Sequence, residues 1–283
     1  MVGGKRRKDI DCVLCCSIMK LSSSTFMQTF CMEEKSMKLK IMTYNICSGH
    51  HFESGNPGIY DLSKCSEVIA KIGPDICGLN EVDFNAKRSG KVDQVGEIGK
   101  VTGMNPFFGK SITFEWDDPD SGYGNAVLTK FPILETEVVP IPDPEVKDEE
   151  AYYETRSVSR VKLDVNGTAV TVLQTHFGLA IAEQQNAQQT ILKLLDTISG
   201  PVILMGDFNI RPNNFLLNPI RERLTDTAFL VDGYFKTFPS YACDYPDCKI
   251  DYVFVSKHFK AVSLDVVQTL ASDHLPYAVE VEL

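Results

Sequence analysis

Polar side chains collect where the expected strands of this 283-residue chain end. They are Asn45 in TYN, Glu81 in GLNE, His176 in QTH, Asp207 and Asn209 in MGDFN, Asp251 in KIDYVFV, and Asp273 with His274 in SDHLP. Taken singly, a strand-end Asp or Asn commonly caps a turn, and a lone His is commonly structural. Taken together, these carboxylates, amides and imidazoles predict metal-assisted attack of water on a phosphoester.

The acids and amides divide between metal and water in that chemistry. Glu81 and Asn45 offer hard oxygen ligands to Mg²⁺, which takes one or two carboxylates and keeps several waters. Asp207 is available as a base for the attacking water. Asn209 lies two residues further, so on an extended chain it faces the same way and would fix that water or a phosphate oxygen.

Cationic donors for the charge that develops on phosphate would come from His176, His274 and Arg156 in YETRS. Asp251 lies inside an otherwise apolar run, where an unpaired carboxylate is costly. A nearby imidazole such as His274 is the simplest compensation, and the same contact would keep that ring oriented and protonated. The sequence has no GxSxG motif and no motif around any cysteine, so serine or cysteine nucleophilic catalysis is not expected.

The elements that must position these groups interleave strands with a few helices. Strands are expected over 38–46, 75–81, 107–114, 123–130, 133–141, 156–165, 168–177, 202–208, 249–256 and 277–283, and helices over 62–72, 92–103 and 181–198. Asn166-Gly167 is the strongest hairpin signal. The helices are too few to cover both faces of one sheet with this many strands. We therefore expect an α/β fold in which two mixed sheets pack face to face, with helices on the outer faces.

The first 36 residues differ from the rest. Met37 opens MKLKIMTYNI, a strand from its first residue, so we expect 1–36 to be a disordered extension and 37–283 a single catalytic domain. Asp9 and Asp11 follow the basic KRRK and interrupt the apolar core that a signal peptide needs. Nine loosely spaced cysteines indicate free thiols in the cytoplasm. Cys243 and Cys248 could form a local bridge or metal contact, but two unconnected thiols are favoured.

Charge bears on the substrate. The net charge is −10, and residues 41–283 carry 20 basic and 34 acidic side chains. Such an acidic body lacks the basic footprint that supplies most duplex affinity, whereas a bound metal reverses the sign locally. Small or headgroup phosphates are therefore favoured over nucleic acid. No run reaches the roughly 18 apolar residues of a membrane helix, and we expect a soluble monomer.

The ordered motifs resemble those of the endonuclease/exonuclease/phosphatase superfamily. TYNI, LNEVD, YGNAVLTKFP, THFGL, GDFN, KIDYVF and SDHLP follow the family's order from about residue 39 to the C-terminus. The resemblance implies a four-layered α/β/β/α sandwich and a divalent metal, Mg²⁺ with Mn²⁺ as a substitute.

Carried over by motif, the resemblance also implies roles for single residues. It implies metal binding at Glu81, Asn45 and Asp273, catalysis at Asp207, Asn209, His176, His274 and Asp251, and phosphate binding at Arg156, Asn209 and His274. Family members most often have Gln before the metal Glu, where this chain has Asn80. The loop KRSGKVDQ (87–94) holds Lys87, Arg88 and Lys91 and could reach a substrate phosphate, but a solvated turn is favoured.

Three functions follow from these patterns. The first is a metal-dependent phosphoesterase acting on a small or lipid-like phosphodiester or phosphomonoester. The second keeps the chemistry and takes DNA or RNA as substrate. The third, a catalytically inactive binding module, is disfavoured because all the expected site residues are present.

Overall fold

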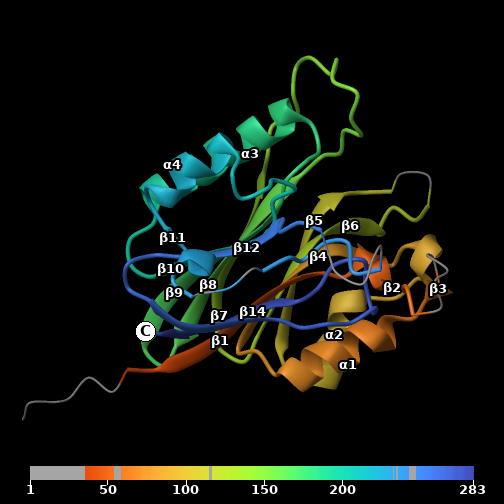
Figure 1. Cartoon of the computed structure of the whole chain (residues 1–283). Coiled ribbons are helices and arrows are strands. Elements are labelled where there is room, and N and C mark those ends of the chain that lie inside the picture. The colour runs from red at the N-terminus through yellow and green to blue at the C-terminus, as the bar shows by residue number, and fades with distance from the viewer. Residues whose placement is uncertain (1–35, 54–58, 115–116, 232, 234, 242–246) are drawn as a thin grey trace, which may run out of the picture. The chain divides into compact units, whose positions relative to one another are not determined.

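Two six-stranded sheets carry the fold in the computed structural model (Figure 1). The first has the order β13 (Lys260–Val266), β14 (Tyr277–Glu282), β1 (Lys38–Asn45), β4 (Ile76–Phe84), β6 (Gly122–Thr129) and β5 (Asn105–Ile112). The second has the order β11 (Thr225–Asp226), β12 (Asp251–Val255), β10 (Val202–Asp207), β9 (Thr168–His176), β8 (Ser157–Val165) and β7 (Ile133–Pro140). A short ribbon pairs β2 (His50–His51) with β3 (Ile59–Tyr60).

The structure describes residues 36–53, 59–114, 117–231, 233, 235–241 and 247–283. Apart from Ser36, the predicted extension over 1–36 lies outside these residues, and so does Cys243 of the predicted cysteine pair. Cys248 is a buried free thiol.

The helices lie on the two outer faces, as the strand count requires. They are α1 (Leu62–Ile72), α2 (Gln94–Thr102), α3 (Ile181–Thr197) and the single turn α4 (Asn218–Arg221). Figure 1 shows α1 and α2 on one side of the pair of sheets and α3 and α4 on the other. None of these described helices has the length and apolar character needed to cross a bilayer.

Strand alternation builds three apolar layers between these elements. On β10, Ile203 and Met205 pack between the two sheets, whereas Leu204 packs under α3. On β1, Ile41 points between the sheets and Met42 points towards α1 and α2. Successive strand residues face opposite sides, so one continuous apolar run supplies two layers. The four-layered α/β/β/α sandwich is confirmed.

Local signals set most element ends. Asp61 and Asp93 accept hydrogen bonds from backbone N–H groups in the first turns of α1 and α2, and Gly73 and Gly103 end these helices in the left-handed conformation. The Asn166-Gly167 turn joins β8 to β9 as predicted. Two departures stand out: β4 continues to Phe84, three residues beyond the expected end, and β13 is an edge strand that the patterning does not predict.

Candidate active site

The carboxyl ends of four strands meet at one end of the space between the sheets. β1 runs parallel to β4 in the first sheet, and β9 runs parallel to β10 in the second. Their last residues are therefore neighbours: Asn45 pairs with Asn80, and Asp207 pairs with His176. Parallel pairing explains why polar side chains spread over more than 160 positions reach one place.

A bulge in β4 directs Glu81 into this space. Leu79 pairs with Ala126 and Val82 pairs with Gly124, so two residues of β4 oppose the single residue Asn125 of β6. Glu81 has a positive φ of 55°, which re-aims its side chain. Its Oε1 accepts a hydrogen bond of 3.0 Å from Asn45 Nδ2.

The GDFN segment combines a close backbone approach with a tight turn. A Cβ at Gly206 would lie 1.9 Å from the carbonyl oxygen of Thr175, so only glycine fits here. Asp207 ends β10, and Asn209 has a φ of 50°. The expectation that Asn209 faces Asp207 along an extended chain is therefore wrong. Instead, the Asn209 N–H donates to Asp207 Oδ1 at 2.9 Å, which closes a turn. The Phe208 side chain is fully buried in the apolar layer under α3.

Asp251, His274 and Asp207 form a buried chain. Asp251 and Asp207 occupy paired positions on β12 and β10, with His274 between their carboxylates. His274 Nδ1 lies 2.9 Å from Asp251 Oδ2, which confirms the predicted pair, and Nε2 lies 3.5 Å from Asp207 Oδ2. Burial favours neutral His274, but the two carboxylates outweigh it and raise its pKa. Burial raises the pKa of Asp207.

Ligand atoms of Asp207, Asp251 and His274 all lie within 4.8 Å of one another, a spacing that a metal site would also have. Each nitrogen of the His274 ring faces one of the two carboxylates. A protonated imidazole between two acids accounts for this geometry. We therefore describe the group as a chain of charges, with a hydrogen bond from His274 to Asp251 and an ion-pair contact from His274 to Asp207.

Asn45 connects the two halves of the site. Its Nδ2 donates to Glu81 Oε1, and lies 3.2 Å from Asp207 Oδ2 and 3.5 Å from His274 Nε2. Its Oδ1 accepts a hydrogen bond from the Cys47 N–H. Asn45 thus joins the carboxylates of both sheets through its amide nitrogen, and metal ligation by its oxygen stays a prediction.

His176 is neutral. Burial and the neighbouring Arg156 lower its pKa well below the ordinary value, which corrects the expectation of a second cationic histidine. Arg156 Nη1 lies 2.8 Å from His176 Nδ1. Because arginine only donates, Nδ1 must accept; Nε2 lies 3.2 Å from Asn209 Nδ2 and 3.5 Å from Asp207 Oδ2. Arg156 also pairs with Glu154 at 2.9 Å.

An amide cluster beneath the site was not assigned any role from the sequence. Asn80 Nδ2 donates to Asn125 Oδ1 and to the Thr175 carbonyl, both at 2.8 Å. Asn80 Oδ1 accepts from Gln174 Nε2 and from the Asp207 backbone N–H, both at 3.0 Å. All four contacts link the two sheets or brace β4. The available signal was the interruption of three apolar strands by amides.

The site opens into a cavity of about 630 Å³. Its walls include Glu81, Arg88, Glu154, Arg156, His176, Asp207, Asn209, Asp273 and His274, with Phe114, Tyr123, Tyr152 and Phe238 among the apolar lining. Asp251 lies behind His274 and is fully buried. Arg88 is a correction: it belongs to this wall and not to a solvated turn. Glu154 and Tyr123 lie within the stretches YETRS and YGNAVLTKFP, but neither they nor Phe114 was assigned a role from the sequence.

Comparisons with known proteins bear on the family and the fold of this chain. The sequence profile of the Endonuclease/Exonuclease/phosphatase family matches residues 42–274. The chain belongs to this family. The match covers every candidate residue from Asn45 to His274. A search of curated protein sequences returned no match.

Solved structures of the family share the fold. An endonuclease/exonuclease/phosphatase from Beutenbergia cavernae is 27% identical, with a TM-score of 0.68, and the alignment covers 87% of this chain and 72% of that one. A mannosyl-6-phosphatase from Bacteroides thetaiotaomicron is 19% identical, with a TM-score of 0.68 over 86% and 99% of the two chains. D. rerio TDP2 complexed with a single-strand DNA product is 16% identical, with a TM-score of 0.63 over 86% and 98%.

The residues beside Glu81 fit the divalent metal that the family generally uses. Burial raises the pKa of Glu81, and the nearby carboxylate of Asp273 raises it further. Two acids that repel each other at the wall of one cavity gain from a cation between them. Carboxylate oxygens are ligands that Mg²⁺ and Mn²⁺ accept. Glu81 and Asp273 would therefore hold the ion, with Asn45 beside them.

Proposed function

We propose that this protein is a divalent-metal-dependent hydrolase that cleaves a phosphoester by in-line attack of an activated water. Its proposed substrate is a small or lipid-like phosphodiester or phosphomonoester. One observation carries the proposal: Glu81 from one sheet and Asp207 from the other converge on a single cavity and share the Asn45 amide between them. A carboxylate that can bind a metal, a base for water and a cationic hydrogen-bond donor within one cavity are what phosphoester hydrolysis needs.

Asp207 is the base in this proposal. Its Oδ1 accepts the Asn209 N–H and its Oδ2 faces Asn45, so the carboxylate is held in one orientation. Burial raises its pKa, which makes it a better proton acceptor than an exposed aspartate. It would take the proton of the water as the oxygen attacks phosphorus, and the leaving oxygen would depart on the opposite side.

His274 and Asn209 are the phosphate-binding donors in this proposal. Asp251 keeps His274 protonated and oriented, so its charge is in place before the substrate arrives. The Asn209 amide, which donates to the Phe177 carbonyl, lies at the same wall. Arg156, only 8% exposed, adds a fixed positive charge beside neutral His176. When bound, a divalent cation would polarise a phosphoryl oxygen.

Size and charge support a small substrate. A cavity of about 630 Å³ lies in the range that small-molecule sites occupy. The net charge of −10 disfavours a duplex. Relatives of the same fold include both a mannosyl-6-phosphatase and a protein bound to single-strand DNA, so nucleic acid is the competing substrate class.

A metal-dependent screen tests the proposal. The full chain, stripped with EDTA and reloaded with Mg²⁺ or Mn²⁺, would be assayed on nitrophenyl phosphate mono- and diesters, sugar and inositol phosphates, phospholipids, plasmid and oligonucleotides. We expect hydrolysis of small phosphoesters that EDTA and Glu81→Gln abolish. Robust nicking at nanomolar enzyme would overturn the substrate assignment. No hydrolysis of any compound with either metal would overturn the enzyme itself.

A further inference from the structure

Arg88 is a rigid cation on the cavity wall that the proposed chemistry does not use. Its Nε and Nη2 donate to the two oxygens of Asp83 at 2.9 and 2.7 Å, and Nη2 also reaches Ser48 Oγ at 3.2 Å. Asp83 is fully buried, so this fork-to-fork pair is firmly anchored. An arginine side chain normally loses conformational entropy when it binds a ligand. Because the side chain of Arg88 is already held by Asp83, this cost is smaller here.

Two aromatic rings hold the other side of the guanidinium. Its Cζ lies 5.0 Å from the centre of the Phe114 ring and 5.2 Å from that of Tyr123. Both rings are nearly buried in a small cluster of their own. The rings fix the plane of the guanidinium and exclude water from its face.

One edge of this guanidinium is left for a ligand. Within the described part of the chain, Nη1 has no hydrogen-bond acceptor, and 44% of the side chain is exposed. Arg156 differs, since it is nearly buried and both His176 and Glu154 contact its Nη1. Arg88 is thus the more exposed of the two arginines on this wall, with an Nη1 that can meet a substrate.

Position relates Arg88 to the reaction centre. Its anchor Asp83 lies two residues beyond Glu81 on β4, and Glu81 and Arg88 line the same cavity. Glu81 is among the charges that raise the pKa of Arg88. Tyr123, whose ring lies under Arg88, also interacts with Arg156 through its hydroxyl group, so the wall is continuous between the two arginines.

We propose that Arg88 binds a second anionic group of the substrate, a phosphate or carboxylate, in the same cavity as the scissile phosphate. This inference rests on the proposed function and narrows its substrate class to phosphoesters that carry a second anion. Asp83, Phe114 and Tyr123 position Arg88.

Calorimetric binding of phosphonates tests this without turnover. Alkane-α,ω-bisphosphonates with one to six carbons would be titrated into the Mg²⁺-loaded full chain, beside alkylphosphonates of the same lengths. We expect at least one bisphosphonate of the series to bind at least tenfold more tightly than the monophosphonate of the same length. Mg²⁺ chelation is the same for every protein variant, so differences between variants report the site.

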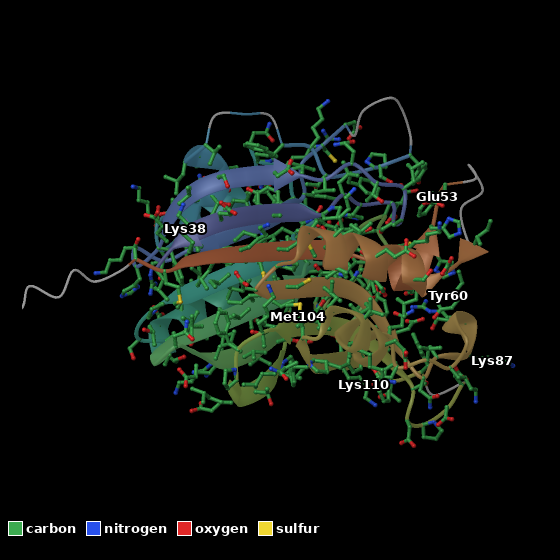
Figure 2. The ribbon with its side chains drawn as sticks, turned by 90° about the horizontal axis from the view of Figure 1, so that it is seen from below. Lys38, Glu53, Tyr60, Lys87, Met104 and Lys110 are labelled. Atoms are coloured by element: carbon green, nitrogen blue, oxygen red, sulfur yellow. The ribbon has the colours of Figure 1, made fainter. Side chains whose placement is uncertain are left out.

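The matched variants are Arg88→Gln and Lys87→Gln. Lys87 neighbours Arg88, carries the same charge and does not line the cavity, and Figure 2 shows it at the outer edge of the chain. Arg88→Gln should abolish the preference for two anions, and Lys87→Gln should retain it. Because Arg88→Gln leaves Asp83 buried without a partner, the double variant Asp83→Asn/Arg88→Gln provides a folded alternative. Arg88→Lys, which keeps the charge but not the fork, should lose most of the preference.

Two outcomes would overturn the inference: no preference in the wild type, or a preference that survives both Arg88→Gln and the double variant. Neither depends on hydrolysis. If phosphoesters are hydrolysed but bisphosphonates gain nothing, the Arg88 inference alone fails. If bisphosphonates bind through Arg88 but no phosphoester is hydrolysed, the proposed function alone fails.

Discussion

The space between the two sheets is apolar at one end and polar at the other, although the same strands build both. On β10, Ile203 and Met205 pack in the core between the sheets, and two residues later Asp207 faces the catalytic cavity. On β1, Ile41 lies in the same core, and four residues later Asn45 links the carboxylates. The difference is one of side chains, since backbone pairing continues through both regions.

Each region solves a different problem. The apolar end is stabilised by removal of side chains from water, which needs no specific partner. The polar end is nearly as buried, so each group there needs a hydrogen bond, at a cost of about 1–3 kcal/mol if one is missing. Asn80 shows the result, because its amide makes four such bonds between the sheets and within the first sheet. The apolar end therefore stabilises the fold, and this stability offsets the cost of burying polar groups at the other end.

The largest expected effect breaks the polar end without loosening the fold. Asp207→Asn should lower kcat by about 10²–10⁴-fold, because an amide cannot accept the proton of water. The free energy of unfolding should stay the same or increase, because burial disfavours the charge that the substitution removes. Steady-state kinetics and urea unfolding on the same preparation measure both. A lower free energy of unfolding that accompanies the loss of kcat would indicate that the Asp207 carboxylate is structural.

The converse change falls four residues earlier on the same strand. Ile203→Ala should lower the free energy of unfolding by about 2–5 kcal/mol, because it leaves a cavity in the fully buried core between the sheets. At temperatures where the variant stays folded, kcat should remain within about twofold of the wild type. Chemical denaturation and kinetics test the pair. A large loss of kcat in folded Ile203→Ala would mean that the two ends are not independent.

The pH profile sharpens the assignment of charges at the polar end. Asp207 must be deprotonated to act as base and its pKa is raised, so kcat/KM should fall with decreasing pH well above the ordinary aspartate value of about 3.9. Asp251 is a principal cause of the raised pKa of His274. In the proposed function His274 acts as a cation, so kcat/KM should also fall at alkaline pH as His274 loses its proton. Asp251→Asn should lower the pKa of His274 and move this alkaline limb to lower pH. Profiles of kcat/KM for both proteins measure this, and an unmoved alkaline limb would exclude the Asp251–His274 pair from catalysis.

The smallest effect concerns a buried charge outside the catalytic cavity. Lys249 is 7% exposed, its Nζ lies 3.0 Å from the centre of the Tyr252 ring, and burial lowers its pKa to about 7. The unfolded chain binds this proton up to about pH 10, so wild-type stability should rise with pH above 7 by at most about 1.4 kcal/mol per unit. Lys249→Met should remove that increment and leave kcat unchanged. Unfolding at several pH values tests it, and parallel stability curves would contradict the lowered pKa.

Sequence patterns were sufficient for what repeats along the chain. Alternation and turn residues predicted the two sheets, and Asp61 with Gly73 bounds α1 where the pattern placed it. The strand β13 was missed because it is a half-exposed edge, so no buried face imposes alternation on it. Asp251 and His274 were paired correctly because a carboxylate in an apolar strand demands a partner.

What the sequence could not supply depends on register and on tertiary contact. The lowered pKa of His176 follows from its burial and from its contact with Arg156, 20 positions away, and no spacing rule contains either. The turn at Asn209 needs a positive φ that an extended interpretation of GDFN excludes. The sequence around Arg88 is typical of a charged loop, and its place on the cavity wall depends on tertiary contacts with Asp83 and the aromatic rings.

The bulge at Asn80 and Glu81 has a consequence for how this site could be lost. A deletion of Asn80 would let β4 pair with β6 without interruption, so the sheet could form unchanged. The carboxylate of Glu81 would then take the place of the Asn80 amide, facing the oxygen atoms of Asn125 and Thr175. Activity is thus encoded in a count of residues as well as in their identities. A family member that lacks one residue here would keep all the catalytic residues in the same order along the chain, but its active site would not form.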